Sequence, residues 1–332
     1  MQRAQNILTV ASPGRRTLLK AAGVAATGTL FGRRVLAQDN VTRIVVPFPA
    51  GNPIDAIARV LAEALRQSTG RNYIVDNKAG AAGIIGTSEV ARSRPDGSTM
   101  LFTTGGHNTN AVLYSKLPYD VSRDFTPITQ LLVSPGFVLL TRADSRFKTL
   151  ADVLAEAKAK PGTVSYASWG PGNTTHLVGA LFARAARVDL MHVPYKGSPF
   201  PDLLGGHVDL TWFGTSPSMQ LIQEGKVRAL AISWPQRIPE LPNVPSVAEF
   251  GFKDVDIPSW GGLFGPAGMP AALVQSIHAD VVAASRRPEY VAAMKTMGAT
   301  ITNMAPQQFA ELNAEELRRH RKDIGPLAIK LD

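Results

Sequence analysis

The chain has 332 residues, a formal net charge of +9 and no cysteine. The absence of cysteine excludes disulfides, thiolate zinc sites and a cysteine nucleophile. A sequence pI of about 9.9 suggests a nucleic-acid partner, unless the positive charge lies in a segment that the mature chain lacks.

Residues 1–37 have the features of an export signal. The twin-arginine signature RRTLLK (15–20) precedes a weakly apolar run at 21–31. That run is shorter than the ~20 apolar residues that span a bilayer. A small-residue cleavage site, VLA, then ends at Ala37. We therefore expect a mature periplasmic chain that begins near Gln38; the alternative is a disordered basic arm.

Removal of this segment lowers the net charge from +9 to +3, because its six basic residues have no acidic counterpart. The remaining 295 residues contain no run of Lys or Arg and no basic stripe interleaved with aromatic residues. They also contain no stretch that is long and apolar enough to cross a membrane. We expect a monomer without a nucleic-acid partner.

The first element after the signal is a strand at 44–46 that leads through a small-residue loop into a helix. Asn52 suits the N-cap of this helix and Pro53 its first position. Asp55 occupies the third position, where a carboxylate complements the helix dipole. We expect the helix to end at Gly70. A loop of this kind leaves backbone N–H groups unpaired, so it predicts an anion site.

A glycine-rich loop follows the second predicted strand. In chain order we expect a strand at 73–75, the loop AGAAGIIG (79–86), a helix at 87–92, a turn at 95–97, a strand at 100–102 that opens into TTGGHN (103–108), and a fourth strand at 137–141. The loop has the spacing G-x-x-G-x-x-G, and no ribose-binding acid follows about 20 residues later, so a dinucleotide site is poorly supported. Close packing and a tight turn explain these glycines better.

The second half of the chain repeats the alternation of strands and helices. We expect a helix at 150–158, strands at 164–167, 191–194, 208–212 and 227–233, a helix at 175–186, a return at 260–265, and helices at 270–287 and 306–322. This alternation predicts an α/β protein with parallel sheets. After the signal at 1–37 we predict two domains, 38–138 plus 257–332 and 139–256, with a ligand cleft at the carboxyl ends of their strands.

The loop SWGPGNTTH (168–176) has the same design as the first loop. A strand ends, small and hydroxyl residues turn the chain, and a helix begins at Asn173 or Thr174. Two such helix N-termini facing one cleft would suit a carboxylate. The alternative is that both loops are ordinary strand–helix connections.

Catalytic and metal-binding patterns are weak. Ser168 and His176 with Asp202 or Asp209 would form a triad, but the G-x-S-x-G elbow is missing. The six histidines are scattered, with no H-E-x-x-H pattern, so we expect no metal and no cofactor. The turn Tyr195-Lys196-Gly197 would either line the cleft or form a solvated turn.

Several motifs together resemble the Bug family, the periplasmic solute receptors of tripartite tricarboxylate transporters. The matching motifs run in order along the mature chain: VVPFPAGNPID (45–55), AGAAGIIG (79–86), RPDGSTMLF (94–102), LPYDVSRDF (117–125), KPGTVSYASWGPGNTTHL (160–177), HVPYKGS (192–198), GGHVDL (205–210), GKVRALAIS (225–233) and LPNVPSVAEFGF (241–252). The resemblance implies a type II periplasmic-binding-protein fold. It also implies a small organic acid held by loop amides and bridging waters, and membrane permease subunits as partners.

Two departures from the family pattern concern the ligand. The family usually reads PFPAGG, whereas this chain has Asn52 in place of the second glycine, and asparagine tolerates left-handed backbone better than most residues. The family often carries an acid where this chain has Phe213, next to Trp212. With Trp169 nearby, these aromatic residues favour a ligand with an apolar or aromatic body.

The expected ligand-binding residues lie in loops at strand ends. They are Phe48, Pro49, Ala50, Gly51, Asn52, Asp55, Thr104, Gly105, His107, Ser168, Trp169, Gly170, Gly172, Asn173, Thr174, Tyr195, Lys196, Gly197, Trp212 and Phe213. We expect a receptor that closes by hinge motion near 135–139 and 257–261, without covalent chemistry. The alternatives are a ligand-sensing partner of a membrane signalling protein and a hydrolase that uses Ser168 and His176.

Overall fold

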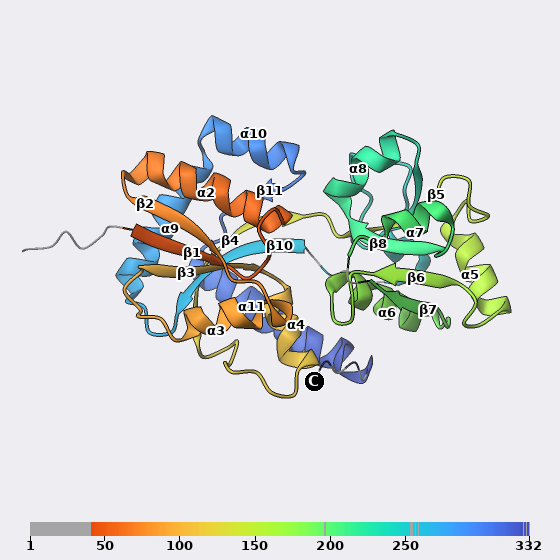
Figure 1. The fold of residues 1–332 in the computed structure, drawn as a ribbon, viewed down its shortest axis with the longest axis horizontal. Coiled ribbons are helices and arrows are strands. Elements are labelled where there is room, and N and C mark those ends of the chain that lie inside the picture. The colour runs from red at the N-terminus through yellow and green to blue at the C-terminus, as the bar shows by residue number, and fades with distance from the viewer. Residues whose placement is uncertain are drawn as a thin grey trace, which may run out of the picture. The chain divides into compact units, whose positions relative to one another are not determined.

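The computed structural model describes residues 41–195, 197–252, 255, 257, 259–327, 329 and 331. The export signal predicted at 1–37 lies outside them. The chain from Val41 onward forms one unit that contains two β-sheets (Figure 1). Among the helices of the described part, none is long and apolar enough to span a membrane.

The first sheet has six strands, in the order β11 (Thr300–Ile301), β4 (Phe125–Ser134), β10 (Ser259–Pro266), β3 (Thr99–Thr104), β1 (Val41–Val46) and β2 (Asn72–Asn77). The strand β1 pairs in parallel with β2 and β3, whereas β10 pairs antiparallel with β3 and β4. The connected helices are α2 (Pro53–Thr69), α3 (Ile84–Ala91), α4 (Gly106–Leu113), α9 (Ala271–Ser285), α10 (Pro288–Thr296) and α11 (Pro306–Asp323), with short 3₁₀ turns η1 (Ala81–Gly83) and η4 (Gly325–Leu327).

The second sheet has five strands, in the order β7 (Met191–Pro194), β6 (Ser165–Ser168), β8 (Leu210–Gly214), β5 (Phe137–Arg142) and β9 (Val227–Ile232). The strand β6 pairs in parallel with β7 and β8, and β5 pairs antiparallel with β8 and β9. Its helices are α5 (Leu150–Ala159), α6 (Thr174–Ala186), α7 (Phe200–Gly205), α8 (Thr215–Gln223) and the 3₁₀ turn η2 (Val247–Phe250).

The strands bury alternate residues on opposite faces, as the period of two requires. In β1, Ile44 and Val46 pack in a cluster with residues of α2 and α9. Val45 belongs to a different cluster, which includes Val90 of α3 and Phe309 of α11. Figure 1 shows α2 on one side of this sheet and α3 and α11 on the other. Both faces are therefore covered, which explains why Ile44, Val45 and Val46 are all apolar.

The helix α2 confirms the sequence prediction at both ends. The Asn52 side chain accepts a hydrogen bond from the N–H of Ile54 (2.9 Å), and Pro53 opens the helix. Gly70 ends it in the left-handed conformation (φ 69°), and its N–H donates to the carbonyl of Arg66. Local capping chemistry fixes this element, so the position of the loop before it is well defined.

The prediction of parallel sheets is wrong, because both sheets are mixed. The strand β10 returns from the second half of the chain and inserts antiparallel between β3 and β4. The strand β4 itself is missing from the sequence prediction. It contains Pro127, which lies beside an irregularity in the pairing with β10, between Leu263 and Phe264. Proline cannot donate to a ladder, so its presence argues against a strand in the sequence alone.

Four helices were also not predicted. They are α4, α7, α8 and α10, which have six to nine residues each. A short helix carries too few turns for its apolar period to be recognised. The most important of them is α4, because it occupies residues expected to form the open loop after β3.

The loop AGAAGIIG forms a left-handed turn followed by a helix. Four successive residues, Gly80 to Gly83, have positive φ, including Ala81 (46°) and Ala82 (52°). The side-chain amide of Asn110 donates to the carbonyl of Ala82 (3.0 Å). Gly86 lies so close to the backbone of Lys78 that a side chain there would collide with it. The glycines therefore serve a tight turn and close packing, as the sequence indicated.

The chain passes from the first sheet to the second between β4 and β5 and returns between β9 and β10. At the first passage, the N–H of Phe137 donates to Ser233 Oγ (2.8 Å), and Thr215 Oγ donates to the carbonyl of Pro135 (2.8 Å). The strand β5 spans the predicted boundary at 138/139, so the exact domain limits stay a prediction.

A further connection was not predicted. Beyond α11, Ile324 is fully buried in the apolar cluster of the second sheet, together with Leu113 at the end of α4. The N–H of Leu331 donates to the carbonyl of Leu113 (3.1 Å), and Arg184 of α6 donates to the carbonyl of Asp323 (2.6 Å). The C-terminal segment thus joins elements that belong to both sheets.

Candidate functional site

The strand order of the first sheet identifies where a ligand would bind. From β1 the chain crosses to β2 on one side, and from β2 it crosses back to β3 on the other side of β1. In open α/β sheets, ligands bind at such a switch point, outside the carboxyl ends of the strands. Here those ends lead into Phe48 and into Thr104–Gly105. The loops predicted from sequence therefore lie at the switch point.

The second sheet has the same arrangement. The chain leaves β6 for β7 on one side and then crosses to β8 on the other. The carboxyl ends of β6 and β8 carry Ser168–Trp169 and Phe213–Gly214. These two strands are parallel neighbours. The predicted loop 168–175 thus begins at the switch point of its own sheet.

The loop before α2 offers fewer free donors than the sequence predicts. The N–H of Gly51 donates to Asp55 Oδ2 (2.8 Å) and the N–H of Asn52 to the carbonyl of Pro49 (3.2 Å). The N–H of Ile54 donates to Asn52, and Pro53 has none. Of the first helical residues, only Asp55 keeps an N–H without an acceptor in the described contacts. This helix N-terminus is therefore largely satisfied by its own chain.

Asp55 is a buried structural carboxylate. Burial opposes its ionisation, but hydrogen bonds from the N–H of Gly51 and from the Arg59 and Asn77 side chains outweigh it and hold its pKa below the usual value. The left-handed residue of the loop is Gly51 (φ 83°), whereas Asn52 is extended (φ −66°). Asn52 thus replaces the family's glycine without strain and acts as the cap.

The loop before α6 has a matching cap but keeps more free donors. Asn173 Oδ1 accepts from the N–H of Thr175 (3.0 Å), and its backbone is extended as at Asn52 (φ −62°, ψ 150°). The N–H of Gly172 donates to His176 Nδ1 (3.0 Å). The N–H groups of Thr174 and His176 have no intrahelical acceptor in a first turn. They are the better candidates to bind a carboxylate.

Two stacked imidazoles support this loop from below. The rings of His176 and His192 lie 3.9 Å apart at 5°, and Ser168 Oγ lies 2.7 Å from His192 Nε2. Burial and, to a smaller extent, the neighbouring His192 together lower the pKa of His176 to about 4. Burial also lowers the pKa of His192. Both rings are therefore neutral at pH 7, which leaves His176 Nδ1 free to accept the N–H of Gly172.

The triad considered from sequence does not form. Ser168 contacts His192 rather than His176. Asp202 accepts from Tyr195 Oη (2.7 Å), and Asp209 accepts from Ser165. Neither carboxylate therefore orients an imidazole, as a serine hydrolase requires. Within the described residues, no group of three or more His, Asp or Glu side chains could hold a metal ion.

The aromatic residues separate into an exposed pair and a buried ring. Trp169 stacks on Phe213 with centroids 5.9 Å apart at 19°, and Trp169 is 37% exposed. Trp212 points to the opposite face of β8, where it is fully buried against Phe182. Trp212 thus lies on the face of β8 opposite to Phe213, and its contact with a ligand stays a prediction. The neighbours Trp212 and Phe213 alternate across the strand.

Four other expected residues lie outside the two loops. His107 is buried in α4 among Tyr119, Phe125 and Phe264, and burial lowers its pKa to about 4. It is thus packed in the core, and its contact with a ligand stays a prediction. The Tyr195 hydroxyl is committed to Asp202. Lys196 lies outside the described residues, and Gly197 is exposed.

Glu316 is a buried carboxylate that the sequence did not single out. It lies in α11 and accepts hydrogen bonds from Trp260 Nε1 (3.0 Å) and from Asn108 Nδ2 (2.6 Å). Burial raises its pKa, against the effect of these two donors. A side chain at Gly105 would contact both Trp260 and Glu316. Glu316 therefore supports the switch point of the first sheet from beneath, through residues distant in sequence.

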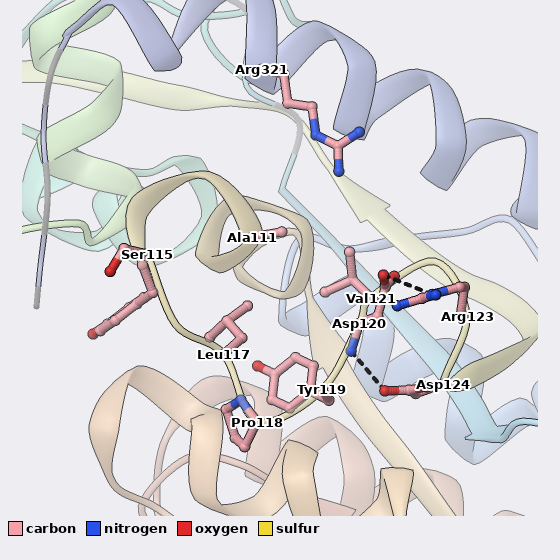
Figure 2. A pocket seen from close by; sticks show the side chains of 11 residues that line it. Ala111, Ser115, Leu117, Pro118, Tyr119, Asp120, Val121, Arg123, Asp124 and Arg321 are labelled. Atoms are coloured by element: carbon pink, nitrogen blue, oxygen red, sulfur yellow. Dashed lines mark hydrogen bonds and ion pairs between the residues drawn. The ribbon is translucent and has the colours of Figure 1, made fainter.

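A hollow of about 500 Å³ lies elsewhere, beside the motif LPYDVSRDF (Figure 2). Its lining includes Asp120, Arg123, Asp124 and Arg321. Arg123 Nε donates to Asp120 (2.9 Å), and the N–H of Asp120 donates to Asp124 (2.7 Å). The polar groups of this motif thus satisfy one another, which indicates a structural turn.

The fold defines the class of protein. The chain is similar to the periplasmic binding protein BugD (32% identity, TM-score 0.76, 87% of this chain and 98% of that one). It is also similar to MatC (Rpa3494) from Rhodopseudomonas palustris with bound malate (29%, TM-score 0.75, 86% and 98%). A third similar structure is R. palustris Rpa4515 with adipate (31%, TM-score 0.77, 87% and 97%). The two mixed α/β sheets are those of a type II periplasmic binding protein.

The family follows from the sequence match. The model of the tripartite tricarboxylate transporter family receptor matches residues 57–328. The chain belongs to this family. It is also similar to the Bug protein BugD. The family consists of solute-binding receptors rather than enzymes. The sequence resemblance to the Bug family is thereby confirmed.

Proposed function

We propose that this protein binds a small carboxylate-bearing ligand in the periplasm and delivers it to the membrane subunits of a tripartite tricarboxylate transporter. The observation that carries the proposal is the pair of switch-point loops, one in each sheet, each leading into a helix capped by asparagine. The similar structures that carry malate and adipate support a carboxylate as the ligand.

The proposed site consists of the loops at the two switch points. Its proposed residues are Phe48, Pro49, Ala50, Gly51, Asn52, Asp55, Thr104, Gly105, His107, Ser168, Trp169, Gly170, Gly172, Asn173, Thr174, Tyr195, Lys196, Gly197, Trp212 and Phe213. Backbone N–H groups rather than charged side chains supply most donors here, and His176 is held neutral. A bound carboxylate would therefore be held by amides and bridging waters.

Capture is proposed to occur by closure of two domains, 38–138 plus 257–332 and 139–256. The open form binds the ligand, and the closed form is presented to the permease. The hinge would lie near 135–139 and 257–261. The first of these segments is anchored to the second sheet by Ser233 and Thr215, so rotation would be taken up immediately before it.

Export is proposed to use the twin-arginine signal at 1–37, with cleavage near Ala37. N-terminal sequencing of protein recovered from the periplasm tests this step. A mature chain that begins near Gln38 is expected. Recovery of periplasmic protein with Met1 intact would contradict the proposed signal.

A thermal-shift panel of mono-, di- and tricarboxylates and aromatic acids tests the function. A ligand present at 100 times its dissociation constant stabilises the folded protein by about 2.7 kcal/mol. We expect at least one carboxylate to raise the melting temperature in a saturable manner, and the corresponding primary amides to have no effect. If no acid in the panel stabilises the protein, the proposed function is wrong.

A further inference from the structure

Two aromatic rings meet at the switch point of the second sheet. Trp169 follows the end of β6, and Phe213 is the penultimate residue of β8, its parallel neighbour. The two rings stack at 5.9 Å and 19°, and Phe200 packs edge-on against Phe213 at 4.8 Å and 83°. The indole is thus supported from beneath by two further rings.

The backbone of Trp169 is fixed by the loop that carries it. Its N–H donates to Thr175 Oγ1 (3.1 Å), and this hydroxyl donates to the cap Asn173 Oδ1 (3.0 Å). Ser168, the preceding residue, is held by His192. The ring is therefore positioned before a ligand arrives, which reduces the entropy lost on binding.

One face of the indole packs on Phe213, yet 37% of Trp169 remains exposed. An exposed aromatic surface at the switch point of the sheet favours an apolar partner. The same loop supplies the free N–H groups of Thr174 and His176, five and seven residues further along the chain. One loop thus combines donors for a carboxylate with a flat apolar surface.

We infer that Trp169, supported by Phe213, determines specificity by stacking on the ligand, and that the ligand class is carboxylates with a planar aromatic body. The inference rests on the proposed function, because it assumes that a carboxylate occupies the amides of α6. A small polar hydroxy acid would not use this surface, because it has no planar ring that could stack on the indole.

Binding of two matched acids tests the inference. Adipate and terephthalate each carry two carboxylates that are separated by four carbons along the shortest path. The connecting body is flexible and aliphatic in adipate and planar and aromatic in terephthalate. Both are titrated by calorimetry into the exported protein and into Trp169→Ala, Trp169→Phe and Phe250→Ala. Phe250 is the matched control, because it is a comparably exposed aromatic residue (39%) in η2.

The wild type is expected to bind terephthalate more tightly than adipate. Trp169→Ala should weaken terephthalate by about tenfold or more and adipate by less than about threefold, as loss of one stacking contact predicts. Trp169→Phe should recover most of the loss, and Phe250→Ala should change neither acid.

Three results would overturn the inference. The first is a wild type that binds adipate more tightly than terephthalate. The second is a Trp169→Ala variant that loses equal affinity for both acids. The third is a Phe250→Ala variant that loses as much affinity for terephthalate as Trp169→Ala does. In the first two cases adipate still binds, so the proposed function stands while the inference fails. If neither acid nor any other carboxylate binds, the proposed function fails and the inference falls with it.

Discussion

Glu316 illustrates how a single buried charge can organise the edge of a sheet. Its carboxylate joins Asn108 of α4 to Trp260 of β10. Glu316→Leu would leave Trp260 Nε1 buried without its acceptor and Asn108 Nδ2 with Asn313 as its remaining acceptor, at a cost of about 2–5 kcal/mol. Glu316→Gln keeps one acceptor oxygen and should cost less than half as much. Urea denaturation of the two variants measures the difference; equal losses would show that the hydrogen bonds contribute little.

The lowered pKa of His176, in the first turn of α6, predicts that the stability of the protein depends on pH. Its pKa is about 4 in the folded protein, below the ordinary 6.5, so between these values the unfolded chain binds a proton that the folded chain excludes. Stability should therefore fall as the pH drops from 6.5 to 4 and change no further, for this group, below 4. The contribution is at most about 3 kcal/mol.

His176→Asn isolates this effect, because the asparagine oxygen can still accept from Gly172 but does not titrate. Chemical denaturation between pH 4 and 7 should show a shallower pH dependence in the variant than in the wild type. His107, His192 and His320 also have lowered pKa values, so a residual slope is expected. Identical slopes in the two proteins would contradict the role of His176.

At the scale of elements, α2 and α6 both begin with an asparagine N-cap. Asn52 and Asn173 have the same backbone conformation, and each accepts from the N–H two residues later. Replacement of either cap by alanine should cost about 1 kcal/mol, and replacement by glycine only a few tenths. Because Asn52 also belongs to the proposed site, Asn52→Gly should change the ligand preference while the fold is kept.

Thermal unfolding combined with the carboxylate panel measures both effects. The melting temperature and the ligand preference of Asn52→Gly are compared with those of the wild type. Unchanged selectivity in Asn52→Gly would reduce Asn52 to a helix cap without a role in binding.

The elements that the sequence predicts well are those with strong local signals. Asn52, Pro53 and Gly70 define α2 at both ends, and a parallel signal at Asn173 defines α6. The strand β4, which was not predicted, has no strong local signal, and its neighbours β10 and β11 come from far along the chain. The pairing with β10 accommodates Pro127, and no local pattern reports that pairing. The left-handed conformation of Ala81 and Ala82 was not predicted either, because alanine disfavours positive φ.

The candidate site followed the same division. The loops after β1 and β6 were found from their helix-start residues, and topology then placed both at switch points. The burial of His107 and Trp212 was not predicted, because a residue's burial depends on which neighbours cover it. The stack of Trp169 on Phe213 could only be found once β6 and β8 were known to be adjacent.

At the scale of the whole molecule, the C-terminal segment connects elements of both sheets. Ile324 is 1% exposed within the cluster of the second sheet, directly after a helix that packs on the first. Ile324→Ala should destabilise the protein by about 2–5 kcal/mol through the cavity that it leaves. Val291→Ala, at an exposed helical position, should stay within about 0.5 kcal/mol of the wild type.

Equilibrium unfolding monitored by tryptophan fluorescence measures both variants. A loss in Ile324→Ala no larger than that in Val291→Ala would show that the C-terminal segment does not bind the second sheet in solution.

The central claim is that a carboxylate binds at the switch points of both sheets. A crystal structure of the exported protein with the most stabilising acid of the panel tests it most directly. We predict a carboxylate oxygen within hydrogen-bonding distance of the N–H groups of Thr174 and His176, with the loop at 48–52 on its other side. A ligand found instead in the hollow beside Asp120 and Arg321 (Figure 2) would contradict the account.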